Sequence, residues 1–200
     1  MRDETVHDNN IDDWIDDTLA ECLNIEAPKC FFLFAGAGSG KTRSLVNTLK
    51  QVWLKHGKYL RLHNKQIAVI TYTNAASDEI VERLKKEIID VSLFEVSTIH
   101  SFAWKIIQDC TSDIKNWLQI NIARKIEEWE DLEIRGRKGT DASRKRINNI
   151  EKGKERLNRL SSIKRFKYDP NGDNIDKNSL QHEEVISICA SFIGEKALFQ

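Results

Sequence analysis

One glycine-rich segment of the sequence combines residue types that bind phosphate. Residues 35–42 read AGAGSGKT, which matches the Walker A pattern, with Ala35 where the stricter form has glycine. Its three glycines let backbone N–H groups approach phosphate oxygens closely. Lys41 can reach the β- and γ-phosphates of a nucleotide, and the Thr42 hydroxyl can ligate Mg²⁺. We therefore predict an ATP site with Mg²⁺, formed by Ala35, Gly36, Ala37, Gly38, Ser39, Gly40, Lys41, Thr42 and Arg43.

A second segment, AVITYTNAASDEI at 68–80, places polar side chains directly after an apolar run. In an open α/β sheet, the loops beyond the carboxyl ends of the strands carry ligands. Tyr72 could stack on a base of single-stranded nucleic acid, and Thr73 and Asn74 could donate hydrogen bonds to its phosphates. The same residues also fit a capped helix start with Tyr72 as a packing residue. Both interpretations stay open on the residues alone.

A third segment, VSTIHSFAWKII at 96–107, repeats this arrangement. Thr98, His100 and Ser101 stand just before a helix, whose N-terminus favours anions. No acid or nucleophile accompanies His100, so a structural role is more typical of it than catalysis.

Apolar strands that alternate with amphipathic helices must position these segments. The alternation predicts βαβ units, a parallel sheet and an α/β fold. After about residue 112 the strands are expected to stop, and a helical subdomain follows, with a turn-rich loop at 166–179. Strands are expected at 30–35, 66–71 and 94–99. Helices are expected at 11–24, 42–57, 76–89, 101–110, from 114 up to a break at Gly136/Gly139, and at 141–162 and 180–194.

The charge distribution is strongly asymmetric although the formal net charge is zero. Residues 1–29 carry nine acids against two bases, whereas residues 135–167 carry thirteen bases against three acids. A neutral average is therefore no argument against a polyanionic partner, although a solvated, salt-bridged helix would have the same composition. The four cysteines form no C-x-x-C pair, so neither zinc nor a disulfide framework is expected. No apolar run is long enough for a membrane span, and the acidic start is no secretory signal; we expect a cytoplasmic protein.

Together the three segments resemble the superfamily 1 DNA helicases of the UvrD/Rep/PcrA type. Those proteins carry A-G-A-G-S-G-K-T, T-F-T-N-x-A-A and T-F-H-S-F in this order; the matches are AGAGSGKT (35–42), TYTNAAS (71–77) and TIHSF (98–102). The resemblance implies a P-loop, RecA-like core at 1–112 and a basic helical insertion like subdomain 1B at 113–200 that leads back toward the core. It also implies that Lys41 is the catalytic lysine and that single-stranded DNA is lined by Tyr72, Thr73, Asn74, Thr98, His100 and Ser101.

Two departures from the family pattern limit these expectations. The family has a glutamine upstream of the phosphate loop that reads adenine, but no glutamine precedes Gln51. Hydrolysis needs an acidic pair after an apolar strand to hold Mg²⁺ and position water, and the family's D-E-x-Q motif does not occur here. We therefore expect these 200 residues to be the first part of a helicase whose second RecA-like domain is absent, and to hydrolyse ATP poorly in isolation.

Three functions fit the sequence. The first is the ATP-binding part of an ATP-dependent DNA helicase or translocase that acts on single-stranded or partly duplex DNA. The second is a UvrD-like ATPase module that regulates a nuclease partner. The third is a non-catalytic nucleotide-binding fragment, which a stop codon directly after Gln200 would favour.

Overall fold

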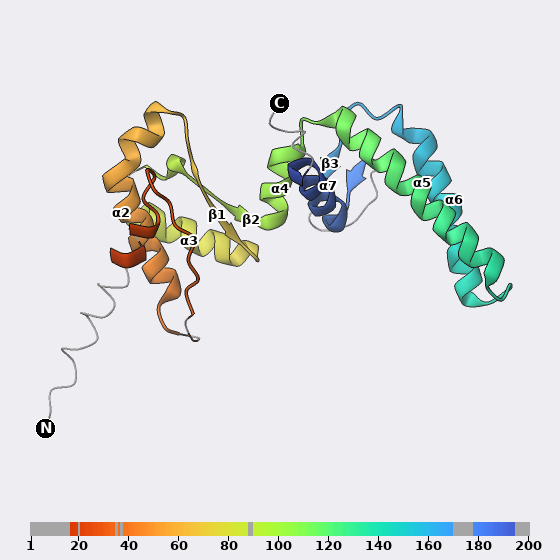
Figure 1. Ribbon diagram of the computed structural model, residues 1–200, viewed down its shortest axis with the longest axis horizontal. Helices are drawn as coiled ribbons and strands as arrows, with labels where there is room; N and C mark the ends of the chain where they lie inside the picture. Colours follow the sequence, from red (N-terminus) through yellow and green to blue (C-terminus); the bar gives the residue numbers. More distant parts are fainter. Residues whose placement is uncertain are drawn as a thin grey trace, which may run out of the picture. The chain divides into compact units, whose positions relative to one another are not determined.

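The computed structural model describes residues 17–19, 21–34, 36, 38–87, 90–169 and 178–194. The chain forms two compact units, residues 1–99 and residues 100–200 (Figure 1). Most of the helix expected at 11–24 lies outside the described residues, although residues 17–19 and 21–22 are helical. None of the described helices has the length and apolarity that crossing a membrane would require.

The first unit contains a two-stranded parallel sheet with helices packed against it. Strand β1 (Ile67–Thr71) pairs with β2 (Phe94–Thr98) in the register Ile67 to Phe94 through Thr71 to Thr98. Helix α3 (Asn74–Glu87) connects them and packs on both strands, and α2 (Lys41–Leu62) packs on α3. The 3₁₀ turn η1 (Val91–Leu93) precedes β2. The predicted strands at 66–71 and 94–99 and their parallel pairing are thus confirmed. The unit's buried apolar residues are Val46, Leu49, Leu60, Val69, Ile80, Leu84, Leu93 and Phe94.

The prediction of a buried strand at 30–35 is wrong for the residues described there. Residues 30–34 have no strand structure and are exposed, with Phe32 80% and Phe34 87% accessible to solvent. An apolar run indicates a tendency to be buried, but a strand also needs a neighbour that pairs with its N–H and C=O groups. The described sheet of this unit, β1 and β2, does not pair with 30–34.

The expected helix end at Gly57 is also wrong, because α2 continues to Leu62. Gly57 is buried inside the helix, where a Cβ atom would lie 3.3 Å from Trp53 Cδ1 and 3.5 Å from Leu93 Cδ1. Glycine is therefore used here for close packing, at a cost in helix propensity of about 1 kcal/mol relative to alanine.

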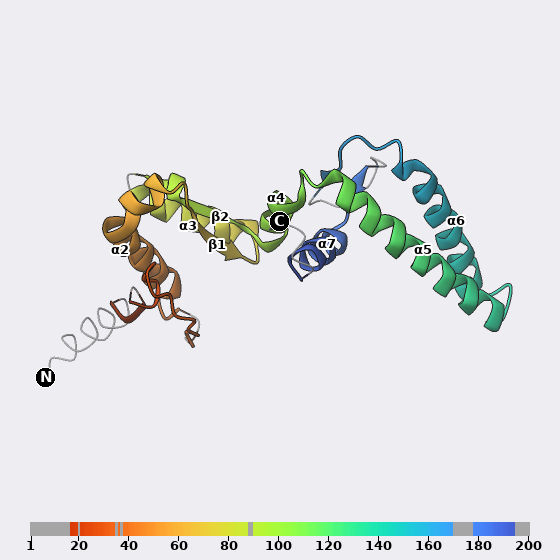
Figure 2. The ribbon, with the colours of Figure 1, turned by 45° about the horizontal axis from the view of Figure 1, so that its top comes forward.

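The second unit, residues 100–200, is mostly helical. Helix α4 (Ile99–Ile107) is followed by the long helices α5 (Thr111–Arg135) and α6 (Asp141–Leu160), which pack side by side as a hairpin (Figures 1 and 2). Helix α7 (His182–Gly194) closes the unit. A short parallel pair, β3 (Lys167–Tyr168) with β4 (Ser179–Leu180), replaces part of the expected loop.

The buried stripe of α5 recurs at every fourth residue, which places its apolar side chains on one face of the helix. These residues are Ile114, Leu118, Ile122 and Ile126. They join one core with residues from α4, α6, α7 and the segments between them. The other buried members of this core are Ala103, Ile107, Leu160, Ile163, Phe166, Leu180, Val185, Ile188, Cys189 and Phe192.

A carboxylate fastens the tip of the α5–α6 hairpin. Glu133 on α5 accepts hydrogen bonds from Ser143 Oγ at 2.5 Å and Arg146 Nε at 2.8 Å, both on α6. Thr140 caps α6 by accepting a hydrogen bond from the Ser143 backbone N–H. The Ser143 hydroxyl and then the Arg146 guanidinium hold the pKa of Glu133 below its usual value.

Replacing Glu133 by glutamine should therefore lower the stability of the hairpin in a pH-dependent way. A depressed pKa contributes stability that is present above the carboxyl's unfolded pKa and is lost as the pH falls through the folded value. We expect Glu133→Gln to lower the thermal unfolding midpoint near neutral pH and the difference from the wild type to shrink in acid. Glu127→Gln, which changes an exposed carboxylate on α5, is the control. Equal effects of the two substitutions would contradict the prediction.

Candidate nucleotide and nucleic-acid site

The glycine-rich segment forms an open loop that leads directly into a helix. Gly38 and Gly40 have φ values of +77° and +79°, a region that L side chains rarely adopt. Gly40 is also the N-cap of α2, whose first turn contains no acidic residue and no side-chain cap. The N–H groups at this helix start are therefore available to an anion, and the helix dipole favours one.

Lys41 stands at the first position of α2 and turns back over the loop. Its ammonium donates hydrogen bonds to the Gly36 carbonyl and, at 3.5 Å, to Ser39 Oγ. Ser39 Oγ also donates to the Gly36 carbonyl at 2.8 Å. A Cβ atom built on any of the three loop glycines meets no heavy atom within 4 Å, so the loop has open space beside its backbone. This arrangement fits a phosphate group, whose oxygens would replace the Gly36 carbonyl as the hydrogen-bond acceptor of the Lys41 ammonium.

The remaining predicted ATP residues lie at the same helix start or outside the described residues. Thr42 is half-buried and Arg43 exposed in the first turn of α2. Ala35 and Ala37 are outside the described part of the chain. Arg43 also lines a pocket of about 280 Å³ between α2 and α3, with Val46, Asn47, Arg83, Lys86 and Glu87.

The end of β1 carries a network of hydroxyl groups, and an exposed aromatic residue, Tyr72, lies between them in the sequence. Thr71 Oγ1 lies 2.5 Å from Ser77 Oγ and 3.0 Å from the Thr73 carbonyl oxygen. Thr73 Oγ1 accepts a hydrogen bond from the Ala76 N–H at 3.2 Å and so caps the start of α3. Tyr72 is 88% exposed. Packing therefore does not account for Tyr72, whereas Thr73 does act in a capped helix start.

The register of the sheet brings the ends of β1 and β2 together. Thr98 is the partner of Thr71 across the two strands, and it is only 9% exposed. Asn74 is exposed at the first position of α3. Four of the six predicted DNA-contacting residues (Tyr72, Thr73, Asn74 and Thr98) thus stand at the same edge of the sheet of the first unit.

His100 and Ser101 follow β2 in the first turn of α4, and His100 belongs to an aromatic cluster of the second unit. Its ring lies 4.6 Å from that of His182, measured between centroids, in an edge-on arrangement. The His182 Nδ1 atom is 2.6 Å from the hydroxyl oxygen of Tyr168. Burial, and then the charge of Asp169, raise the pKa of Tyr168. These contacts are consistent with a structural role for His100 within the second unit.

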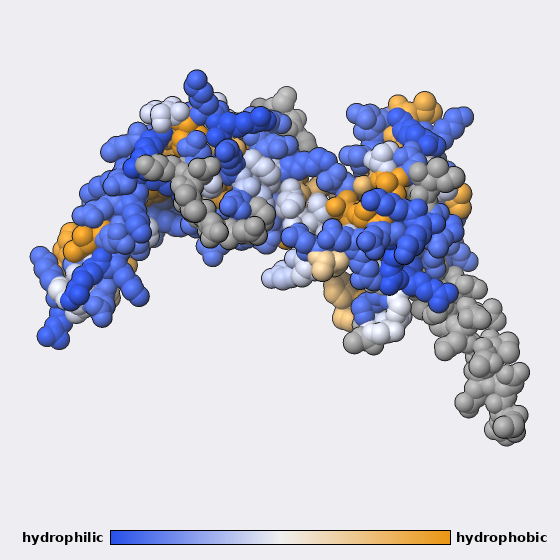
Figure 3. Space-filling model, turned by 180° about the vertical axis from the view of Figure 1, so that it is seen from behind, coloured by the Kyte–Doolittle hydropathy of each residue, from blue (hydrophilic) through white to orange (hydrophobic). Residues whose placement is uncertain are grey.

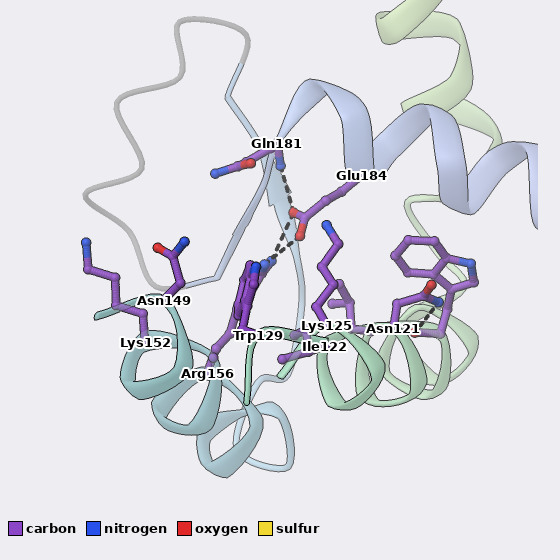
Figure 4. A pocket seen from close by; sticks show the side chains of 12 residues that line it. Asn121, Ile122, Lys125, Trp129, Asn149, Lys152, Arg156, Gln181 and Glu184 are labelled. Carbon is purple, nitrogen blue, oxygen red and sulfur yellow. Dashed lines mark hydrogen bonds and ion pairs between the residues drawn. The ribbon is translucent and has the colours of Figure 1, made fainter. Parts of the chain in front are cut away.

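Sequence reasoning missed a pocket of about 270 Å³ between α5, α6 and the start of α7 (Figure 4). Its lining includes two tryptophans and three cationic side chains on a hairpin whose surface is mostly hydrophilic (Figure 3). A signal was present in the sequence: Trp117, Asn121, Lys125 and Trp129 recur every fourth residue, as on one side of a helix.

Residues 21–196 match the model of the family described as the UvrD/REP helicase N-terminal domain. The match covers both units and includes all residues predicted to bind ATP or DNA. No solved structure matches the chain.

Curated relatives match over less than half of the chain. The Gabija protein GajB of Bacillus cereus is 42% identical over 80 residues, which is 40% of this chain and 11% of the relative. The ATP-dependent DNA helicase SRS2 of Saccharomyces cerevisiae is 33% identical over 38% of this chain and 6% of its own length. An ATP-dependent helicase/nuclease component from Clostridium kluyveri is 30% identical over 42% of this chain and 8% of its own length. The chain thus aligns with about a tenth or less of each of these relatives.

Proposed function

The chain belongs to the UvrD/REP helicase N-terminal domain family, and we propose that it is the ATP- and DNA-binding N-terminal part of an ATP-dependent DNA helicase or translocase. The observation that carries this proposal is the open phosphate loop at the start of α2, in the same unit as two adjacent strand ends with polar side chains. Relatives named as ATP-dependent DNA helicases support it.

In this proposal the phosphate loop holds ATP with Mg²⁺. Lys41 would exchange its bond to the Gly36 carbonyl for the β- and γ-phosphates, and the Thr42 hydroxyl would ligate the metal. When bound, Mg²⁺ would neutralise negative charge on the phosphates, which favours transfer of the terminal phosphoryl group to water. Hydrolysis would further need an acidic pair that these residues do not supply, so the isolated chain would bind the nucleotide but turn it over poorly.

The carboxyl ends of β1 and β2 would form part of the track for single-stranded DNA. Tyr72 is exposed and can present its ring to a base, because the residues on either side of it are tied down by hydrogen bonds. Asn74, at the start of α3, would donate to a phosphate. The family resemblance also proposes Thr98, His100 and Ser101 as contacts to DNA.

Replacing Tyr72 by alanine tests this track. Stacking on an aromatic residue contributes about 1–3 kcal/mol per base, so Tyr72→Ala should weaken binding of a labelled oligothymidylate by about fivefold to a hundredfold. Tyr72→Phe retains the ring and should bind within about twofold of the wild type. The measurement is fluorescence anisotropy at fixed salt, since salt changes every such affinity. Tyr59→Ala, which removes another exposed tyrosine, serves as the control, and an equal loss in this variant would contradict the DNA track.

A second candidate function is an ATPase module that regulates a nuclease partner. One relative favours it, a protein whose name joins helicase and nuclease. The coding sequence downstream of Gln200 distinguishes the two functions. Helicase motifs followed by a nuclease site would favour the regulatory module, and helicase motifs alone would favour the motor.

A further inference from the structure

The pocket of the second unit is formed by side chains from three helices. Helix α5 contributes a row of polar and aromatic residues, α6 contributes a second row, and the start of α7 contributes Gln181 and Glu184. In Figure 4, the side chains of Lys125, Trp129 and Arg156 project into the same space, on the side where Gln181 and Glu184 lie. Its volume of about 270 Å³ is near the lower limit of small-molecule sites, about 300 Å³.

Close packing of α5 on α6 leaves the wall of this pocket without a side chain at one position. Gly153 of α6 lines the pocket, and a Cβ atom there would lie 2.9 Å from Ile126 Cγ1 and 3.6 Å from Ile122 Cγ2. Only glycine lets the two helices approach this closely at that level. The α6 residues Asn149 and Lys152 also line the pocket, whose other lining includes the row on α5.

Two of the three cationic side chains in the pocket have no partner within the described part of the chain. Arg156 is neutralised, because both of its terminal nitrogens donate to Glu184, at 2.5 and 3.0 Å. Lys125 and Lys152 form no hydrogen bond or ion pair with any described residue. With one carboxylate against three cations in the lining, the pocket has an excess of positive charge and favours an anion.

The aromatic components of the lining are two half-buried indoles, Trp117 and Trp129. Both are on α5, with Lys125 between them in the sequence. Flat aromatic surfaces beside ammonium groups are the combination that binds unpaired nucleotides, because the base stacks and the phosphate pairs with the cation. The amides of Asn121, Asn149 and Gln181 add groups that can hydrogen-bond to a base edge.

We propose that this pocket binds one unpaired nucleotide of a DNA strand, with the base against an indole and the phosphate between Lys125 and Lys152. The inference rests on the proposed function for its ligand, but it assigns a site in the second unit that is separate from the phosphate loop and from the Tyr72 track. A free mononucleotide has the same chemistry and is distinguished by experiment.

The first experiment removes the charges of these two lysines. Lys125→Gln together with Lys152→Gln should weaken binding of a labelled oligothymidylate to the chain by about tenfold. The slope of log affinity against log salt should fall by about 0.7, since the two lysines hold one phosphate and each neutralised phosphate of a single strand contributes about 0.7. The matched control is Lys145→Gln with Lys164→Gln, two exposed lysines outside the pocket. Equal losses in the two double variants would indicate diffuse attraction and overturn the proposal.

The second experiment tests the base. An oligonucleotide with abasic sites keeps its phosphates but has nothing to stack, and it should bind about tenfold more weakly than oligothymidylate. Trp117→Leu with Trp129→Leu should reduce that difference to the part that stacking on Tyr72 contributes, and circular dichroism checks that the variant is folded. Equal binding of the abasic strand to the wild type would overturn the proposal. Thymidine monophosphate should bind far more weakly than the strand, and equal affinity would assign the pocket to free mononucleotides instead.

The failure of this inference can be distinguished from failure of the proposed function. If Tyr72→Ala weakens strand binding but the pocket variants do not, the pocket is excluded and the DNA track remains. If the pocket variants weaken strand binding but leave ATP binding unchanged, the two sites act separately, as proposed. Absence of any strand binding by the wild type would contradict both.

Discussion

Replacing Lys41 by alanine is expected to weaken ATP binding by about tenfold to a hundredfold. Hydrogen bonds to charged groups contribute about 1.5–3 kcal/mol, and Lys41 is the only cationic side chain within the predicted loop, residues 35–42. In the structure its ammonium bonds to the Gly36 carbonyl and Ser39, so the loop loses an internal contact as well. The measurement is titration with a fluorescent ATP analogue in the presence of Mg²⁺.

A matched control is available on the same helix. Lys55 is exposed on α2, far along the helix from the phosphate loop. Lys55→Ala should leave ATP affinity unchanged within about twofold, because salt screens the interaction of a distant exposed charge with the nucleotide. The loss of the Lys41 contact to Gly36 also makes a check of folding necessary, by the thermal unfolding midpoint. Unchanged ATP affinity in a folded Lys41→Ala variant would contradict the nucleotide site.

The features that local sequence specifies were predictable. The apolar runs at 66–71 and 94–99 became β1 and β2, and the helix that follows β1, α3, packs on both strands. Lys41 stands at the start of α2 because Gly40 adopts a left-handed conformation there. Glycine spacing alone predicts that geometry.

Features that depend on partners distant in the sequence were not predictable. The apolar run at 30–34 has the composition of a buried strand, yet no described strand pairs with it. Gly57 was interpreted as a helix end because glycine is common there, but its role is to admit Trp53 and Leu93. The pocket of the second unit depends on the approach of α6 to α5 at Gly153, which no local pattern reveals.

Replacing Glu184 by alanine should destabilise the second unit by about 2–3 kcal/mol. Glu184 accepts hydrogen bonds from both terminal nitrogens of Arg156. The side chain of Glu184 is only 17% exposed and that of Arg156 only 29%. It also accepts the Gln181 backbone N–H at 3.0 Å, which completes a cap at the start of α7. The substitution thus leaves a half-buried guanidinium without its partner and α7 without a cap. The measurement is chemical denaturation followed by circular dichroism.

Three further variants separate the ion pair from the cap. Glu183→Ala removes a neighbouring exposed carboxylate and should cost less than about 0.5 kcal/mol. Glu184→Gln can still accept a hydrogen bond from the Gln181 N–H but leaves Arg156 without a counter-charge. Its free energy of unfolding should therefore exceed that of Glu184→Ala only by the contribution of the cap, about 1 kcal/mol. Arg156→Met with Glu184→Met removes both charges, and an apolar pair of similar volume can be nearly neutral. The double variant should therefore be more stable than Glu184→Ala, and the reverse order would show that the pair does not fasten α6 to α7.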